Sequence, residues 1–271
     1  MKKLVTLVVA VMMALGLTAC GSSTTTTPGQ SGQASKGVIR AGATGQSFPN
    51  AFKEGDKLVG FDVELLEAAA KRAGYTVQWT NADFAGLMGQ LEAGRLDTVA
   101  NNVAITEARQ KTYDFTDIYA YMGTSIAGKK GSAVTSLKDL DGKTVAGVLG
   151  SNNVKTLEAW AQKNGYKVTV RTYETRDGAM NDLINGRVDG YVQSSGILLA
   201  EAKKANLPIA LVGDPIAADS IGLPFSKNEQ GTKIRTDINA ELVKMKADGS
   251  IKTLSEKYFG SDVTVKPTVA S

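Results

Sequence analysis

The sequence predicts an α/β protein made of two similar lobes. The main basis is an internal repeat, in which the Leu-x-x-Gly-Arg-Leu-Asp pattern of residues 91–97 returns as Leu-x-x-Gly-Arg-Val-Asp at residues 183–189. Upstream, the Gly-Tyr-x-Val pattern of residues 74–77 returns at residues 165–168. A repeat this long, containing both helix and strand patterns, indicates two α/β lobes rather than a solenoid.

The repeat also predicts where a ligand would bind. In sheets of this kind ligands lie beyond the carboxyl ends of the strands. We therefore expect residues 101–109 of the first lobe and residues 193–195 of the second lobe to face one another across a cleft. The repeat aligns Asn102 with Ser194.

Arg109 is the strongest candidate for a ligand-binding residue in this stretch. It follows a short strand and a polar loop, and it lies in the first turn of a helix that begins near Thr106. A guanidinium group binds a carboxylate through two hydrogen bonds, and helix N–H groups favour an anion nearby. The alternative is a solvated surface cation, although a cation at a helix start opposes the helix dipole.

The remaining elements follow from apolar periodicity and from turn residues. In the first lobe we expect a strand at 37–42, a loop at 43–49, a hairpin at 52–58, a helix at 63–73 and a strand around Val77 and Trp79. In the second lobe we expect strands at 144–148 and 168–173, helices at 151–163 and 176–184, and a strand carrying Tyr191 and Val192.

The amino-terminal residues have the pattern of a secretory signal. Two lysines precede an apolar run from Leu4 to Leu17, which is too short to span a membrane. The sequence Leu-Thr-Ala-Cys, which ends at Cys20, resembles a bacterial lipobox. It implies that residues 1–19 are removed as a lipoprotein signal peptide and that Cys20 carries lipid. The alternative is an ordinary signal peptide with an incidental cysteine.

Residues 20–36 would then form the lipidated cysteine and a flexible tether, because they are rich in Ser, Thr and Gly and have no apolar periodicity. No later apolar run approaches membrane length, so we expect the protein to be anchored without spanning the membrane.

Composition excludes several classes of function. The chain has 271 residues, with 31 Lys and Arg against 27 Asp and Glu, and no basic stripe that would indicate nucleic-acid binding. It has no histidine and one cysteine, Cys20. Ser-His-Asp triads, Cys-His pairs and the usual zinc sites are therefore excluded. We expect no catalytic residue, metal or cofactor, since an enzyme would have to use carboxylates, lysines or tyrosines alone.

A set of motifs carries a family resemblance. The motifs are Leu58-Val59-Gly60-Phe61-Asp62-Val63, Asp83-Phe84-x-Gly86-Leu87, Gly94-Arg95-Leu96-Asp97, Ile105-Thr106-x-x-Arg109, Tyr113-Asp114-Phe115-Thr116-Asp117, Asp248-Gly249-Ser250 and Tyr258-Phe259-Gly260. Together they resemble solute-binding protein family 3, the polar amino-acid-binding proteins of bacterial ABC importers, over residues 37–263. Residues 42–49, 100–103 and 147–152 are most similar to the branch that imports cystine and modified cysteines.

The resemblance implies the type II fold of periplasmic binding proteins, in which two Rossmann-like lobes are joined by two hinge strands and the ligand lies in the cleft between the lobes. The hinge strands are expected at 125–129 and 221–225. The first lobe would then comprise residues 37–125 and 219–271, and the second lobe residues 126–218.

The resemblance also implies a binding site. The expected ligand-binding residues are Phe48, Phe84, Asn101, Asn102, Ala104, Arg109, Ser151, Asn152, Gln193 and Ser194. Arg109 would hold the α-carboxylate of the ligand, helped by the backbone N–H of Ala104 and by Ser151 and Asn152. The Phe84 and Phe48 rings would form opposing walls. For both rings the alternative is core packing, and the register of the first loop leaves Ser47 as an alternative to Phe48.

Three positions depart from the family pattern. Ala104 stands where the family often has a hydroxyl group, and Thr44 stands where the first loop usually has an acid. Ser194 replaces the aspartate that holds the ligand's α-ammonium group. Either Gln193, Ser194, Asn101 and carbonyl groups hold the ammonium group instead, or the natural ligand has a modified amino group.

The resulting prediction is a lipid-anchored extracytoplasmic receptor, monomeric, that delivers a polar amino acid or a derivative such as cystine to an ABC permease. One alternative is a dehydratase-type enzyme on the same fold, which would need a pocket acid or base that is absent at Thr44, Ala104, Gln193 and Ser194. The other is a ligand sensor for a membrane kinase.

Overall fold

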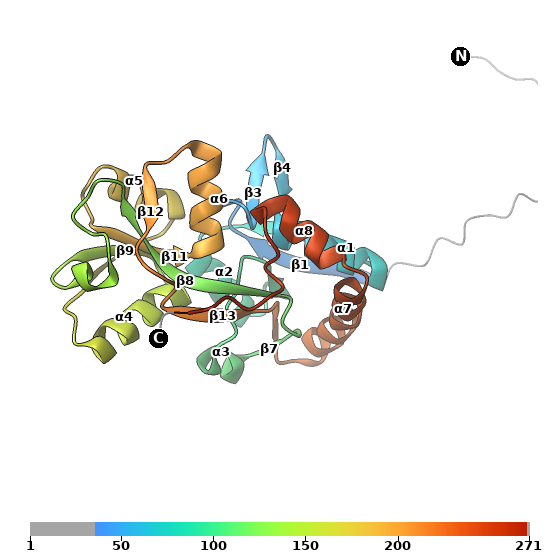
Figure 1. Cartoon of the computed structure of the whole chain (residues 1–271). Coiled ribbons are helices and arrows are strands. Elements are labelled where there is room, and N and C mark those ends of the chain that lie inside the picture. The colour runs from blue at the N-terminus through green and yellow to red at the C-terminus, as the bar shows by residue number, and fades with distance from the viewer. Residues whose placement is uncertain (1–35, 270–271) are drawn as a thin grey trace, which may run out of the picture. The chain divides into compact units, whose positions relative to one another are not determined.

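Residues 36–269 are described by a computed structural model. The predicted signal peptide, Cys20 and nearly all of the predicted tether lie outside the described residues. The described part contains two larger β-sheets with helices packed around them, and one small sheet (Figure 1). The predicted α/β class with two sheet-centred halves is confirmed.

The first sheet has the strand order β5-β1-β6-β14-β7. Its strands are β1 (Gly37–Ala43), β5 (Tyr75–Asn81), β6 (Thr98–Val99), β7 (Tyr113–Phe115) and β14 (Pro224–Ser226). The strands β5, β1 and β6 run parallel, and β14 pairs antiparallel with both β6 and β7. The carboxyl ends of the three parallel strands therefore lie at one edge of the sheet.

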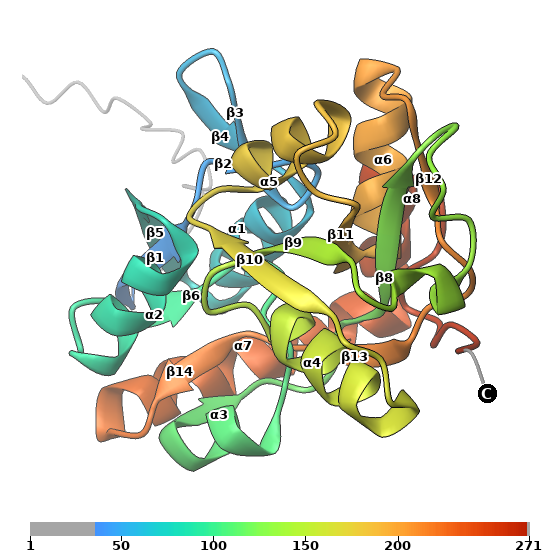
Figure 2. The same cartoon turned by 90° about the vertical axis from the view of Figure 1, so that its left-hand side faces the viewer.

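The second sheet has six strands, in the order β10-β9-β11-β8-β12, with β13 also paired to β8. Its strands are β8 (Ala120–Lys129), β9 (Thr144–Val148), β10 (Thr169–Tyr173), β11 (Gly190–Ser194), β12 (Ile209–Leu211) and β13 (Ala217–Ile221). Here β10, β9 and β11 are parallel, whereas β8 is antiparallel to β11, β12 and β13. Figure 2 shows β9, β10 and β11 side by side with α4 (Asn152–Asn164) below them.

The chain leaves the first sheet after β7, enters the second along β8, and returns along β13 to β14. The strands β8 and β13 pair antiparallel from Ala120–Ile221 to Thr124–Ala217. These two paired strands are the only covalent route between the two sheets within the described residues.

The other elements complete each half. The small sheet consists of β2 (Gln46–Ser47), β3 (Ala51–Glu54) and β4 (Lys57–Val59), and the last two form the predicted hairpin. The other helices are α1 (Phe61–Ala73), α2 (Phe84–Glu92), α3 (Glu107–Thr112), the 3₁₀ helix η1 (Leu137–Leu140), α5 (Arg176–Ile184), α6 (Ser195–Ala205), α7 (Glu229–Ala247) and α8 (Ser250–Phe259).

The amphipathic helix α1 shows why these elements form. Its apolar residues recur at helical spacing, and Leu65, Leu66 and Ala69 are fully buried. The helix ends at Gly74, whose φ of 87° lies in the left-handed region that favours glycine. The buried face of α1 packs with apolar residues of β1, α7 and α8 into one core.

The internal repeat has a structural meaning. Asp97 Oδ2 accepts a hydrogen bond from the backbone N–H of Arg40 in β1 at 2.8 Å. In the second half, Asp189 Oδ2 accepts one from the backbone N–H of Thr144 in β9 at 2.9 Å. In both halves the repeated aspartate precedes a strand and ties it to a neighbouring parallel strand, so the repeat marks equivalent positions.

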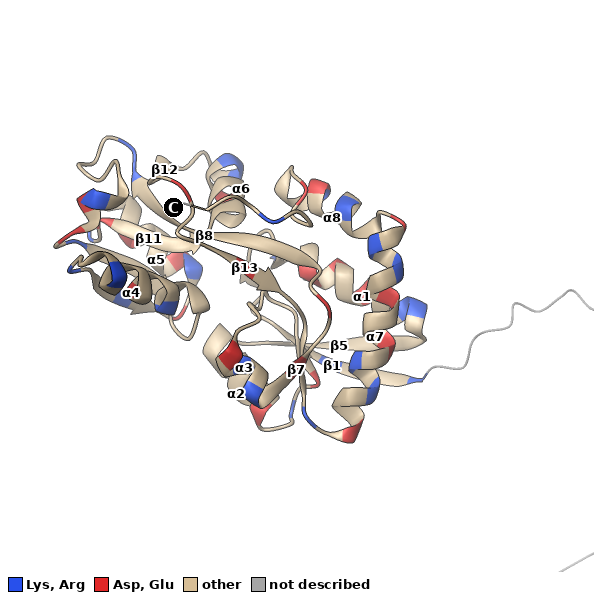
Figure 3. Ribbon diagram, turned by 60° about the horizontal axis from the view of Figure 1, so that its bottom comes forward, with Lys and Arg blue, Asp and Glu red and all other residues tan. Residues whose placement is uncertain are grey.

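Charged residues of both signs are distributed along α1, α7 and α8 (Figure 3). Two pairs connect these helices, Arg72 with Asp248 at 2.7 Å and Lys257 with Glu64 at 2.7 Å. Exposed pairs of this kind contribute little stability, roughly 0–1 kcal/mol each. None of the helices in residues 36–269 combines the length and the apolar character that crossing a bilayer requires.

Candidate functional site

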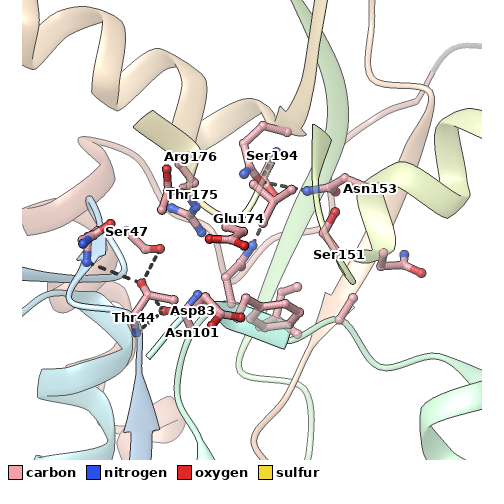
Figure 4. A pocket seen from close by; sticks show the side chains of 18 of the residues that line it. Thr44, Ser47, Asp83, Asn101, Ser151, Asn153, Glu174, Thr175, Arg176 and Ser194 are labelled. Atoms are coloured by element: carbon pink, nitrogen blue, oxygen red, sulfur yellow. Dashed lines mark hydrogen bonds between the residues drawn. The ribbon is translucent and has the colours of Figure 1, made fainter. Parts of the chain in front are cut away.

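A cavity of about 250 Å³ lies where the carboxyl ends of the parallel strands of both sheets meet. Its walls come from the loops that follow β1, β5 and β6 in the first sheet and β9, β10 and β11 in the second sheet. Figure 4 shows the side chains of Thr44 and Asn101 on one side of the cavity and those of Ser151 and Ser194 on the other. This is the position that the repeat predicted for a ligand.

The structure brings together nine of the predicted site residues around this cavity. They are Phe84, Asn101, Asn102, Ala104, Arg109, Ser151, Asn152, Gln193 and Ser194. The tenth, Phe48, does not line the cavity.

Arg109 lies at the cavity and bridges its two sides. Thr106 caps α3 by accepting a hydrogen bond from the backbone N–H of Arg109 at 3.2 Å. The guanidinium group donates through Nη1 to the carbonyl oxygen of Ala104 at 2.9 Å and through Nη2 to that of Gly150 at 3.3 Å. These contacts use two of its five N–H donors, so the group retains donors for an anion.

The two aromatic predictions have different outcomes. The Phe84 ring lies under the guanidinium group of Arg109, with 5.6 Å between the ring centroid and Cζ. The Phe48 ring instead packs against Phe52 at 4.9 Å and against Nζ of Lys204 at 3.9 Å. Gln46 and Ser47 of β2 line the cavity, whereas Phe48 lies in the turn that follows β2, outside the cavity.

The first-sheet side of the cavity is a polar network. The Thr44 hydroxyl lies 2.6 Å from Ser47 Oγ and 3.0 Å from Asn101 Oδ1, which also accepts from the backbone N–H of Thr44 at 3.1 Å. Asn102 has φ 56°, and its Nδ2 donates to Ser194 Oγ at 3.2 Å. This hydrogen bond connects the two sides of the cavity.

A buried carboxyl group supports the loop that carries Asn102. Asp62, near the start of α1, accepts hydrogen bonds from the backbone N–H of Asn102 at 2.5 Å and from the Tyr119 hydroxyl at 2.8 Å. Its side chain is fully buried, and this burial raises its pKa to about 6, although these hydrogen bonds lower it. Asp62 therefore holds Asn102 in its left-handed conformation at the rim of the cavity.

The second-sheet side contains both engaged and unengaged polar groups. Gln193 Oε1 accepts from Asn153 Nδ2 at 2.8 Å and from the backbone N–H of Ser194 at 2.9 Å, and its Nε2 donates to the Tyr191 hydroxyl at 3.0 Å. In contrast, Ser151 Oγ on this side and Asn102 Oδ1 on the first-sheet side are buried and have no hydrogen-bond partner within the described residues. Buried polar atoms normally have partners, so these two atoms indicate positions for ligand groups.

Several residues that line the cavity were missed by the sequence analysis. The main ones are Asp83, Glu174, Thr175, Arg176 and Asp219. The repeat could have identified some of them. Thr175 caps α5 by accepting from the Gly178 N–H at 3.1 Å, just as Asp83 caps α2 by accepting from the Gly86 N–H at 2.7 Å. Arg176 is thus the second-half equivalent of Phe84.

Arg176 also reaches across the cavity. It is 8% exposed, and its Nη1 donates to the carbonyl oxygen of Phe48 at 3.2 Å. Together with the hydrogen bonds from Asn102 to Ser194 and from Arg109 to Gly150, this contact joins the two sides at three separate points.

Asp219 has no local motif that could have revealed it. It lies on β13, accepts from Asn152 Nδ2 at 2.8 Å and from Thr124 Oγ1 at 2.5 Å, and is half-buried. Burial raises its pKa, while these hydrogen bonds and the charge of Arg109 lower it. The cavity therefore contains a cation and a carboxylate that interact electrostatically.

The chain has two α/β halves joined by paired strands, and a polar cavity lies between the strand ends. This arrangement defines a two-lobed protein that binds a small ligand. Comparisons with known proteins agree with this class. The family of bacterial extracellular solute-binding proteins, family 3, matches residues 39–261. The chain belongs to this family of amino-acid-binding proteins of ABC transporters.

Individual relatives are similar over most of the chain. The probable amino-acid-binding protein YxeM of Bacillus subtilis (strain 168) is 46% identical over 267 residues, which cover 98% of each chain. The L-cystine-binding protein TcyJ of Escherichia coli (strain K12) is 32% identical, over 84% of this chain and 85% of its own. An ancestral arginine-binding protein bound to arginine is 35% identical, with a TM-score of 0.75 over 83% of this chain and 99% of its own. The predicted family and two-lobed fold are thus confirmed.

Proposed function

We propose that this protein is the substrate-binding component of an ABC importer and that the cavity holds a polar amino acid or a derivative of one. The observation that carries the proposal is the position of Arg109, which lies between the two sides of the cavity with N–H donors to spare. A guanidinium group in this position binds an α-carboxylate bidentately.

The remaining polar groups fit the same ligand class. The unpartnered oxygen atoms of Ser151 and Asn102 flank the cavity. A cavity of about 250 Å³ accommodates one small molecule. The relatives named for cystine and arginine support an amino acid, and cystine or a cysteine derivative is the ligand that we favour.

Delivery to a permease requires that the two lobes close around the ligand. We propose that the first lobe comprises residues 37–125 and 219–271, and the second lobe residues 126–218, with β8 and β13 as the hinge. A ligand that is contacted from both sides of the cavity binds the closed state more tightly than the open state. This difference in affinity is what stabilises the closed state. The hydrogen bonds of Arg109, Asn102 and Arg176 across the cavity join the two sides without a ligand, so they favour the closed state in addition to any ligand contact.

We further propose that the protein is a monomer that lies outside the cytoplasm and is held at the membrane by lipid on Cys20. The Leu-Thr-Ala-Cys sequence supports the anchor, and the membership in an extracellular solute-binding family supports the location. A tether formed by residues 21–36 would let the binding lobes reach a permease in the same membrane.

Native mass spectrometry of the protein as purified tests the proposed ligand class. We expect a bound species whose mass matches an amino acid or a derivative, and calorimetry with that compound should give saturable binding of one molecule per chain. If neither a retained ligand nor any compound in a panel of amino acids, L-cystine and N-acetylated cysteines bound, the proposal would be wrong.

One observation favours an enzyme as a second candidate. The sequence showed no acid at four expected positions, but Asp83, Glu174 and Asp219 all line the cavity, so an acid or base is present after all. Relatives of the chain are named as binding proteins, which favours binding without catalysis. Incubation with prephenate or arogenate separates the two functions, because a dehydratase would release both carbon dioxide and water and a binding protein would leave both compounds intact.

A further inference from the structure

The cavity has a carboxylate that no sequence pattern assigned to ligand binding. Asp219 lies on β13, one of the two strands that connect the sheets, where it pairs with Met122 of β8. Its Oδ1 accepts from Asn152 and its Oδ2 accepts from Thr124. A carboxylate offers about four lone-pair positions. Two remain after these contacts, on a group that lines the cavity.

The neutral side chains that the sequence analysis offered in place of an acid at position 194 each already accept at least one hydrogen bond. Gln193 Oε1 accepts two hydrogen bonds within its own half, and Ser194 Oγ accepts one from Asn102. Asn101 Oδ1 accepts from both the backbone N–H and the hydroxyl of Thr44. An ammonium group would have to displace these donors at Gln193 and Asn101, whereas Ser194 Oγ has one acceptor position left, and none of the three residues carries a compensating charge.

Asp219 differs from the other two acids that line the cavity. Asp83 and Glu174 are exposed to solvent, whereas Asp219 is half-buried, where charge interactions are screened less. Asp219 and Arg109 interact electrostatically but form no salt bridge within the described residues. Both groups line the cavity, so the two opposite charges face the same ligand space.

This arrangement matches a zwitterion. In a free α-amino acid the carboxylate and the ammonium group are bonded to the same carbon atom, so they need a cation and an anion close together in the site. We infer that Asp219 binds the α-ammonium group of the ligand and takes the role of the acid that is missing at Ser194. This inference rests on the proposed function and adds to it that the natural ligand has a free amino group.

The competing interpretation is that Asp219 only orders Asn152 and Thr124. An asparagine at position 219 separates the two interpretations, because its oxygen can still accept from one of these partners while the negative charge is lost. A structural role predicts an equal change in affinity for every ligand. Charge recognition predicts a change only for ligands with a free ammonium group.

The experiment compares wild type, Asp219→Asn and the matched control Asp214→Asn, in which the same substitution is made at an exposed position outside the cavity. A thermal-shift panel of the twenty protein amino acids and L-cystine selects the compound that binds wild type most tightly. Calorimetry then gives the dissociation constants of that compound and of its Nα-acetyl form. Thermal unfolding of each variant shows whether it is folded.

We expect wild type and Asp214→Asn to bind the free amino acid at least tenfold more tightly than its Nα-acetyl form. In Asp219→Asn the free amino acid should lose at least tenfold in affinity, and the Nα-acetyl form should lose less than threefold. Equal losses for both compounds, or no loss for either, would overturn the inference and leave the proposed function intact.

The wild-type protein alone provides a second test, which does not depend on how the variant folds. If wild type bound the Nα-acetyl form as tightly as the free amino acid, the inference would be wrong and the proposed function would stand with a modified ligand. If no compound in the panel bound, both the inference and the proposed function would be wrong.

Discussion

The amide group of Asn102 donates a hydrogen bond to the hydroxyl group of Ser194 at 3.2 Å and so connects the two sides of the cavity. The internal repeat places these two residues at equivalent positions, Asn102 after β6 and Ser194 at the end of β11. The family resemblance implies an aspartate at the position of Ser194, so we expect this contact to lie where relatives have an acid.

Ser194→Asp tests the consequence of that difference. The new carboxylate should still accept from Asn102 and would add a negative charge beside the cavity. It should tighten the binding of the free amino acid, since a charge-assisted hydrogen bond contributes roughly 1.5–3 kcal/mol, and weaken the binding of its Nα-acetyl form. Calorimetry with both compounds measures the two changes. Weaker binding of the free amino acid by Ser194→Asp would show that the neutral hydroxyl is the better partner.

Cys20→Ser tests the anchor. The variant cannot receive lipid at this position, and the binding lobes are described from residue 36 onward, so the protein should be released from the membrane with its ligand affinity unchanged. Fractionation of cells that express wild type or Cys20→Ser, followed by calorimetry of the released protein, measures both properties. A variant that remained in the membrane fraction would contradict lipid attachment at Cys20.

The stability of the protein should depend on pH because of two carboxyl groups, that of Asp62, which is fully buried, and that of Glu201, which is partly buried. Burial raises the pKa of Asp62 from 3.8 to about 6 and that of Glu201 from 4.5 to about 7. A raised pKa means that the folded state binds these protons more tightly than the unfolded state does. The stabilisation is therefore present at acidic pH and is lost as the pH rises through the folded-state values.

For Asp62 the free energy of unfolding should fall by roughly 1 kcal/mol between pH 5 and pH 7.5. Urea unfolding of wild type and of Asp62→Asn at both pH values measures this loss. The variant should show a smaller decrease than wild type, whatever its absolute stability. An identical decrease in both proteins would mean that Asp62 does not titrate in this range.

Much of the fold could be predicted because local patterns repeat in it. The glycines after α1 and α4 end their helices in left-handed conformations, and Asp97 and Asp189 tie equivalent strands together. The positions of Asn102 and Ser194 opposite one another followed from the same repeat. These features depend on short stretches of sequence, so a single chain is enough to reveal them.

Other features of the site depend on geometry that no short stretch encodes. Phe48 lies in the turn that follows the two-residue strand β2, where its ring packs against Phe52 and Lys204 and not against the cavity. Asp219 reaches the cavity from a returning strand outside the repeat, and only the pairing of β13 with β8 brings it there.

Arg109 carries the central claim that the cavity binds an α-carboxylate. Arg109→Ala would leave a carboxylate in the cavity without its cation, which should cost roughly 2–5 kcal/mol of binding free energy. Arg109→Lys should restore only part of this loss, because an ammonium group lacks the two-pronged donor geometry. The matched control is Arg95→Ala, at an exposed position outside the cavity, which should bind as wild type does.

Calorimetric titration of wild type and Arg109→Ala with the same amino acid tests this claim most directly. The predicted result is a rise in the dissociation constant of at least about thirtyfold, corresponding to about 2 kcal/mol, with a melting temperature close to that of wild type. An unchanged dissociation constant would contradict the account and would make Arg109 a cation that serves only to join the two sides of the cavity.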